Sequence, residues 1–187
     1  MRPLSKLDIL RKVWGVIQES QPGSDEKTNQ DDQIKSRPSA LTDNPGEEKA
    51  IRALAQEFAK AINNRDYETL DGRAEYHLYT MDHLIELVKN NDEQKTIKLF
   101  NENKIKSRYE DCDFISITFS ADPEEAVVVY NVRTCLLDGE EKFFKELNKN
   151  NKTKALKSGT PFTTPYTLIV KKEKGAWKVS SFETAGT

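Results

Sequence analysis

In the first half of the chain, apolar residues recur at three- and four-residue steps, the spacing of one helix face. The clearest stripe follows Pro45, a residue that suits the first turn of a helix. Its members are Ile51, Leu54, Ala55, Phe58, Ala61 and Ile62. We expect this helix to end near Asn63, a short helix to follow at 66–70, and a third helical stretch to cover 80–100.

In the second half, the period of the apolar positions changes to two residues, which is typical of β-strands. Alternation from Ile115 to Phe119 and a β-branched and aromatic run at 126–136 predict one hairpin, with Ile115 facing the helices. A second hairpin is expected over 166–182. The intervening segment 138–165 is too long for a hairpin loop, so it is expected to form an inserted excursion with a short helix.

Helices followed by antiparallel strands predict an α+β domain over 45–187, with the helices packed on one face of a curved antiparallel sheet. Two segments precede it. Residues 1–17 predict a basic amphipathic helix, and the polar segment 18–44 predicts a flexible linker because it contains few apolar residues. The apolar stripe of the first segment, expected to contact a membrane or a partner, includes Leu4, Leu7, Leu10 and Trp14.

Two segments of the domain resemble a known superfamily. Ala55 to Leu70, with the sequence AQEFAKAINNRDYETL, is similar to the first helix of the nuclear-transport-factor-two-like superfamily, also called the cystatin-like cone. The segment 166–179 ends in Gly-Ala-Trp-Lys-Val after a charged turn and is similar to the closing hairpin of that superfamily. The resemblance implies a cone-shaped fold. Because the superfamily includes isomerases, cyclases and dehydratases as well as assembly modules, the resemblance leaves the function open.

One branch of the superfamily has a similar organisation. The scaffold subunits of type IV secretion and conjugation machines carry such a domain after a basic segment, one membrane helix and a polar tether. This chain has the basic segment and the tether, but no membrane helix stands near Trp14 to Gln18. The resemblance implies a scaffold role and a location at the cell envelope or on a membrane.

Composition narrows the classes of function. The 29 Lys and Arg residues against 31 Asp and Glu residues give a net charge of −2, so nucleic acid is not an expected partner. No apolar run approaches the ~18–20 residues that cross a bilayer. The 2 cysteines cannot form a disulfide scaffold or a four-thiolate zinc site, and no phosphate-binding glycine loop occurs. We therefore expect neither a metal nor a cofactor.

A ligand pocket in the cone would be lined by side chains on the helices and on the concave face of the sheet. The candidates are Phe58, His83, Tyr130 and Trp177. A small-molecule enzyme of the isomerase or dehydratase type would need an acid–base group there, and His83 is the residue to examine. Aromatic residues on a concave sheet can equally fill a core. The sequence predicts no catalytic residue and leaves an enzyme or a ligand sensor as the alternative.

The register of the first hairpin predicts the position of the two cysteines. A loop at 122–125 pairs Ala121 with Ala126. Continued along both strands, this register places Cys112 directly opposite Cys135, on the face away from the helices and within reach of a disulfide. An oxidising compartment would close the bridge, and a reducing one would leave two thiols.

Together these features predict a non-enzymatic interaction or assembly domain, with a conjugative type IV secretion scaffold as its most specific form. Protein partners are expected, with a homo-oligomer among the possibilities. An anionic membrane surface is the partner that suits the basic segment 1–17.

The basic segment generates a spectroscopic prediction. Insertion of its apolar stripe into a bilayer moves Trp14 out of water, while its lysines are attracted to anionic headgroups. We expect the fluorescence of Trp14 to shift to shorter wavelength when anionic vesicles are added. An unchanged spectrum would instead favour a protein partner for this segment.

Overall fold

The computed structural model describes residues 45–70, 72–149 and 155–184. The expected helix at 1–17 and the expected linker at 18–44 lie outside the described residues. The same holds for the side chains expected to contact a membrane, which are Leu4, Leu7, Leu10 and Trp14.

Helices dominate the first half of the described chain and strands the second half; the exceptions are the two-residue strand β1 and the helix α5. The elements are α2 (Pro45–Asn63), β1 (Arg65–Asp66), the 3-10 helix η1 (Tyr76–Leu78), α3 (Met81–Asn90), α4 (Asp92–Asn103), β2 (Lys106–Phe119), β3 (Glu125–Asp138), α5 (Glu141–Asn148), β4 (Pro161–Glu173) and β5 (Ala176–Thr184). Among these helices, none combines the length and the apolar character needed to cross a membrane.

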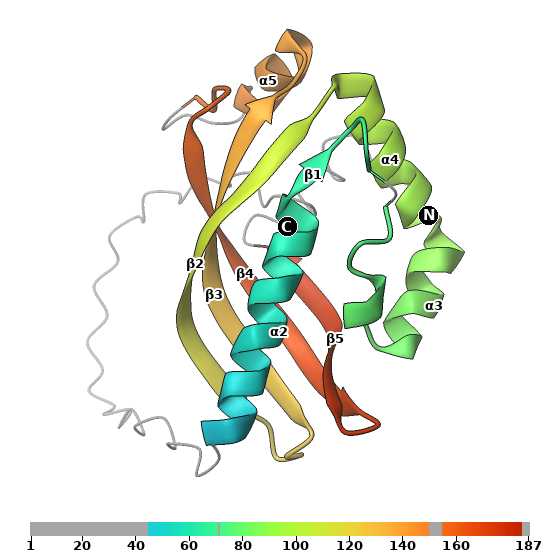
Figure 1. Cartoon of the computed structure of the whole chain (residues 1–187), viewed down its shortest axis with the longest axis vertical. Helices are drawn as coiled ribbons and strands as arrows, with labels where there is room; N and C mark the ends of the chain where they lie inside the picture. Colours follow the sequence, from blue (N-terminus) through green and yellow to red (C-terminus); the bar gives the residue numbers. More distant parts are fainter. Residues whose placement is uncertain (1–44, 71, 150–154, 185–187) are drawn as a thin grey trace, which may run out of the picture.

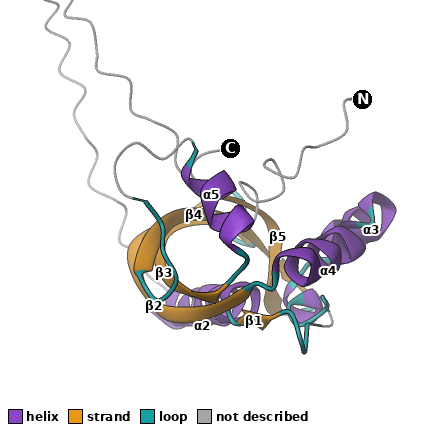
Figure 2. Ribbon diagram, turned by 90° about the horizontal axis from the view of Figure 1, so that it is seen from above, coloured by secondary structure: helices purple, strands orange, loops and turns teal. Residues whose placement is uncertain are grey.

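The strands form one antiparallel sheet in the order β1-β2-β3-β4-β5. The sheet is strongly curved, and α2 lies along its concave face (Figure 1). Seen from above, the curved strands wrap around much of a circle, while α3 and α4 stand to one side (Figure 2). The predicted α+β fold, with helices on one face of a curved antiparallel sheet, is confirmed.

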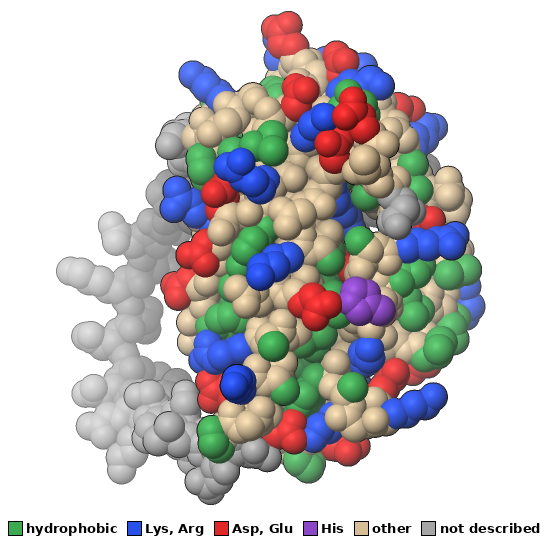
Figure 3. Space-filling model, in the orientation of Figure 1, with side chains coloured by type: hydrophobic (Ala, Val, Ile, Leu, Met, Phe, Trp, Pro, Cys, Tyr) green, Lys and Arg blue, Asp and Glu red, His purple; other side chains and the backbone are tan. Residues whose placement is uncertain are grey.

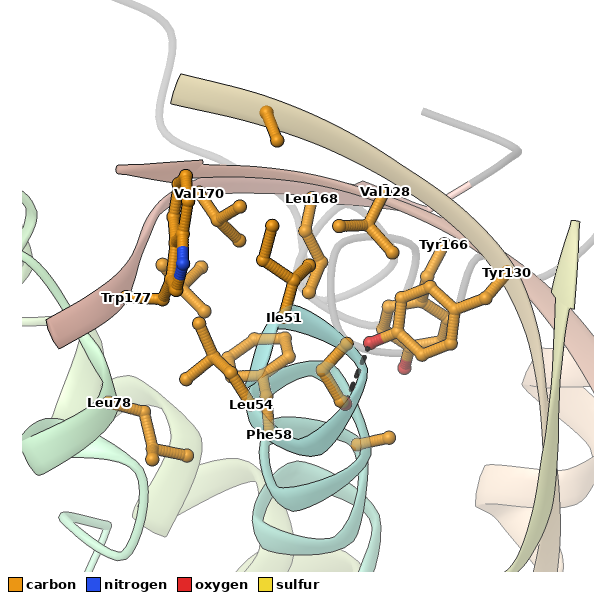
Figure 4. Packing of buried hydrophobic residues seen from close by; sticks show 14 of the residues in the cluster. Ile51, Leu54, Phe58, Leu78, Val128, Tyr130, Tyr166, Leu168, Val170 and Trp177 are labelled. Atoms are coloured by element: carbon orange, nitrogen blue, oxygen red, sulfur yellow. Dashed lines mark hydrogen bonds between the residues drawn. The ribbon is translucent and has the colours of Figure 1, made fainter. Parts of the chain in front are cut away.

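The main core forms where α2 meets the concave face of the sheet (Figure 4). Five of the six residues of the expected helical stripe are buried and Ala61 is half-buried; Ile51, Ala55 and Phe58 have no exposed surface. Leucine, valine and tyrosine side chains of β3 and β4 pack against it, among them Val128, Tyr130, Tyr166, Leu168 and Val170. Apolar burial of this extent is the dominant favourable contribution to folding.

Polar contacts fix both ends of α2. Near its start, Glu47 accepts hydrogen bonds from Nζ of Lys172 and from Nε1 of Trp177, both at 2.5 Å. The bond from Lys172 contributes most to holding the pKa of Glu47 below its usual value. At the other end, the buried Asn63 accepts a bond of 2.9 Å from Oγ1 of Thr134. These contacts attach α2 to the sheet at two points.

Strand β2 contains two β-bulges, which the alternation of its residues did not predict. Glu110 and Ile115 each fall at a register shift and have no partner in β3. Each extra residue reverses which face the following side chains occupy. Ile117 therefore faces the core as expected, whereas Ile115 is 60% exposed. The expectation that Ile115 faces the helices is wrong.

The predicted cysteine pairing is also wrong. The hairpin loop starts one residue earlier than expected, since N–H of Ser120 donates to O of Glu125, and the two bulges shift the register further. Cys112 lies opposite Val132 on the core face, and Cys135 lies opposite Arg108. Because Cys135 sits between two residues of the core face, it points to the other side of the sheet. Both cysteines are free thiols.

The helical segments differ from the expectation in two places. Instead of a short helix at 66–70, residues 65–66 form β1, and N–H of Tyr67 donates to O of Ile105. The stretch 80–100 is divided at Asn91, whose φ of 54° lies in the left-handed region. Asparagine tolerates this conformation better than most residues, so it ends α3 and allows α4 to start in a new direction.

A second, smaller core lies at the end of the sheet where α5 packs. Phe143 and Leu147 of α5 contact a cluster that includes Phe100, Ile105 and Leu136. The short helix expected within 138–165 is therefore present as α5, and its two apolar residues hold it to the domain.

A pair of substitutions tests the consequence of the bulge at Ile115. Leu168 has no exposed surface, so we expect Leu168→Ala to lower the free energy of unfolding by about 2–5 kcal/mol. Ile115→Ala removes side-chain carbons from an exposed position and is expected to change stability by less than about 0.5 kcal/mol. Urea unfolding measures both. A large loss for Ile115→Ala would show that this side chain faces the core.

Candidate functional site

A cavity of about 400 Å³ lies beside the main core, not within it. Its walls come from the end of α2, β1, the segment around η1, the inner face of α3, the start of α4 and the end of β5. Elements from both halves of the chain therefore build it. Its volume falls in the range of small-molecule sites.

One of the four pocket candidates lines this cavity. His83 does so from α3. Phe58 and Tyr130 are fully buried in the main core, and Trp177 is 7% exposed there. Figure 4 shows these three side chains packed between α2 and the sheet. The expectation that they line a pocket is wrong, because they fill the concave space that they would otherwise surround.

A buried ion pair forms part of the cavity wall. Arg65 of β1 and Glu75, which directly precedes η1, are joined by a contact of 2.6 Å between Nη2 and Oε1. Their side chains are 6% and 9% exposed. The Arg65 guanidinium also lies over the ring of Phe100, with 5.9 Å between Cζ and the ring centroid. Nε of Arg65 is buried and has no hydrogen-bond partner in the described part of the chain.

An aromatic group forms another part of the wall. The rings of Tyr79 and His83 are tilted against each other at a centroid distance of 4.5 Å, and Phe182 lies 6.4 Å from His83. Burial lowers the pKa of His83, so its imidazole is neutral at pH 7. Burial likewise raises the pKa of Tyr79, which keeps its phenol protonated. These rings present an uncharged, largely apolar surface.

Carboxylates surround the rest of the cavity. Glu93 accepts bonds from Nε of Arg73 at 2.9 Å and from the hydroxyl of Tyr76 at 3.3 Å. Asp92 pairs with Lys95 at 3.0 Å. Glu86 of α3 also lines the cavity and makes no ion pair with any described residue. The lining contains five acidic and two basic residues, so its charge is negative.

The opposite face of α3 is apolar and open to solvent. Met81, Ile85 and Val88 recur at helical spacing and are 62%, 45% and 69% exposed. We call these three residues the α3 patch. Leu84 and Leu87 hold the helix to the main core. In the space-filling view, hydrophobic side chains gather over α3 (Figure 3). A single helix thus separates a cavity from an exposed apolar surface.

Sequence reasoning missed the ion pair and the α3 patch. Arg65 lies in the two-residue strand β1 and Glu75 in the loop before η1, and no periodic spacing links the two residues. For α3 a signal existed, because the helix carries Met81, Leu84, Ile85, Leu87 and Val88. Five large apolar residues in ten occupy a wider arc than one buried face requires.

No protein-family model matches the chain, and no curated protein matches it. Similar solved structures include an IcmL-like type IV secretion system protein from Legionella pneumophila. It is 13% identical, with a TM-score of 0.44 over 74% of this chain and 91% of that chain. They also include an NTF-2-like protein of unknown function from Shewanella oneidensis, 16% identical, with a TM-score of 0.38 over 74% of this chain and 98% of that chain. Similarity at these identities and TM-scores does not indicate that this chain shares the function of either protein.

The buried ion pair generates a stability prediction. Glu75→Gln would leave the Arg65 charge buried without its partner, so we expect the free energy of unfolding to fall by about 3–5 kcal/mol. The matched control is Glu48→Gln, which removes an exposed pair with Arg52 whose side chains are 36% and 44% exposed. That change is expected to cost less than about 1 kcal/mol. Equal effects in urea unfolding would contradict a special role for the buried pair.

Proposed function

We propose that this chain is a non-enzymatic interaction and assembly domain that docks a partner protein on the α3 patch. The observation that carries the proposal is the exposure of Met81, Ile85 and Val88 on one side of a ten-residue helix. Large exposed apolar clusters on a monomer mark sites of association. The patch belongs to a helix that the core already holds through Leu84 and Leu87.

The surroundings of the patch favour a protein over a lipid surface as the occupant. Asp82 and Glu86 on α3 are acidic, and Lys89 is its one basic residue. Helices that bind anionic bilayers carry several basic residues beside their apolar face. Protein interfaces instead combine an apolar centre with a polar rim of both charges. We therefore assign the patch to a protein partner that presents an apolar centre of its own.

A more specific form of this role is a scaffold subunit of a conjugative type IV secretion machine. What supports this form is the sequence resemblance, in which a basic segment and a polar tether precede the domain. In such an assembly the α3 patch would join the domain to a neighbouring component, while the basic segment 1–17 would remain near a membrane surface.

Site-specific photo-crosslinking in the cells that produce the protein tests the docking role. A photoreactive amino acid at Val88 is expected to form an adduct with one defined protein, identified by mass spectrometry. Ile85→Asp should abolish that adduct, because a charge in the centre of the patch opposes apolar docking. The same photoreactive group at Lys142, an exposed position on α5, serves as the matched control.

The stability of the variant must be measured alongside the adduct. Ile85 is 45% exposed, so Ile85→Asp should unfold at nearly the same urea concentration as the unchanged chain. An adduct with lipid alone, no adduct above the Lys142 control, or an adduct that survives Ile85→Asp would each contradict the proposal.

A further inference from the structure

The cavity on the inner side of α3 contains a buried cation with unused hydrogen-bond donors. Arg65 is 7% exposed and lines the cavity. Within the described chain, its side chain makes one hydrogen bond, which Nη2 donates to Glu75, so several of the five N–H groups of the guanidinium have no protein acceptor. An enclosed charged donor without an acceptor is unfavourable, and most such groups in proteins have one. This end of the cavity therefore favours an occupant that supplies an oxygen atom.

The wall formed by α3 and α4, in contrast, favours a positively charged group. Glu86 and Asp92 both line the cavity and act electrostatically on His83. Asp92 is partly compensated by Lys95, whereas Glu86 forms no ion pair with the described residues. With five acidic and two basic residues in the lining, an anionic ligand would be repelled and a cation attracted. The oxygen offered to Arg65 should therefore be neutral.

The surface between these two ends is suited to an apolar body. Tyr79 and His83 present closely spaced rings, and Phe182 extends the same wall. Leu87 and Ile62 also line the cavity. Apolar and aromatic lining with a few polar groups that fix orientation is the usual composition of a small-molecule site.

From this arrangement we propose that the cavity binds a small organic cation that carries a neutral carbonyl or hydroxyl oxygen and an apolar body. Its ammonium group faces Glu86, its oxygen accepts a hydrogen bond from the Arg65 guanidinium, and its apolar body lies on Tyr79 and His83. The site lies on the inner side of α3, away from the α3 patch. It is therefore independent of the proposed docking function.

Phenylalaninamide is the probe, because it combines an aromatic ring, an ammonium group and a neutral carbonyl. Titrated into the ¹⁵N-labelled full chain, it is expected to bind in the millimolar range and to shift the Nε–H resonance of Arg65. Three matched compounds separate the contributions. Phenethylamine lacks the carbonyl, N-acetylphenylalaninamide lacks the ammonium group, and phenylalanine replaces the amide by a carboxylate. Each is expected to bind more weakly.

A variant tests the cationic end without disturbing the buried pair. Glu86 is exposed, so Glu86→Gln should fold normally and weaken phenylalaninamide binding about fivefold. It should leave the binding of N-acetylphenylalaninamide unchanged. Glu141→Gln, at an exposed position on α5, is the control and should have no effect on either compound.

The outcomes are distinct. A shift of the Arg65 resonance together with the loss caused by Glu86→Gln supports the site. The proposal is overturned if the Arg65 resonance does not move at millimolar phenylalaninamide, if Glu86→Gln leaves its affinity unchanged, or if phenethylamine binds equally well. None of these results bears on photo-crosslinking at Val88, so failure of one proposal does not decide the other.

Discussion

The packing of α2 into the concave face of the sheet is the contact on which the rest of the structure depends. Phe58 lies at its centre, with ring centroids 5.1 Å from Phe182 and 5.7 Å from Tyr79. Close packing of this kind leaves no room for a ligand between α2 and the strands. Because these side chains fill the concave space of the sheet, the cavity lies to one side, where the end of α2, the segment around η1 and α3 form its walls.

The bulges of β2 allow the sheet to curve around α2. Each bulge bends its strand and increases the local twist, so a long strand can follow a concave surface. Their second effect is to change the faces of individual residues. Ile115 is exposed by this effect, and Cys112 faces the core, opposite to Cys135. Curvature and cysteine placement thus have the same physical origin.

Helix α3 connects the two proposed surfaces. Its inner side supplies His83 and Glu86 to the cavity, and its outer side carries the α3 patch. None of its residues is fully buried, and Leu84 and Leu87 hold it to the core through partial burial. A helix held by few buried contacts adjusts at low cost in free energy. The same weak attachment leaves both of its sides accessible.

The amino-acid sequence by itself determined the fold class, the stripe of α2 and the strand run at 126–136 that forms β3, because helical and strand periodicities depend only on neighbours in the chain. Tertiary structure decided the bulges, the cysteine positions and the cavity. These features depend on which residues meet across strands, and one extra residue reverses a face without changing the local pattern. The ion pair between Arg65 and Glu75 depends on the tertiary structure, which places β1 at the edge of the sheet and the residue before η1 next to it.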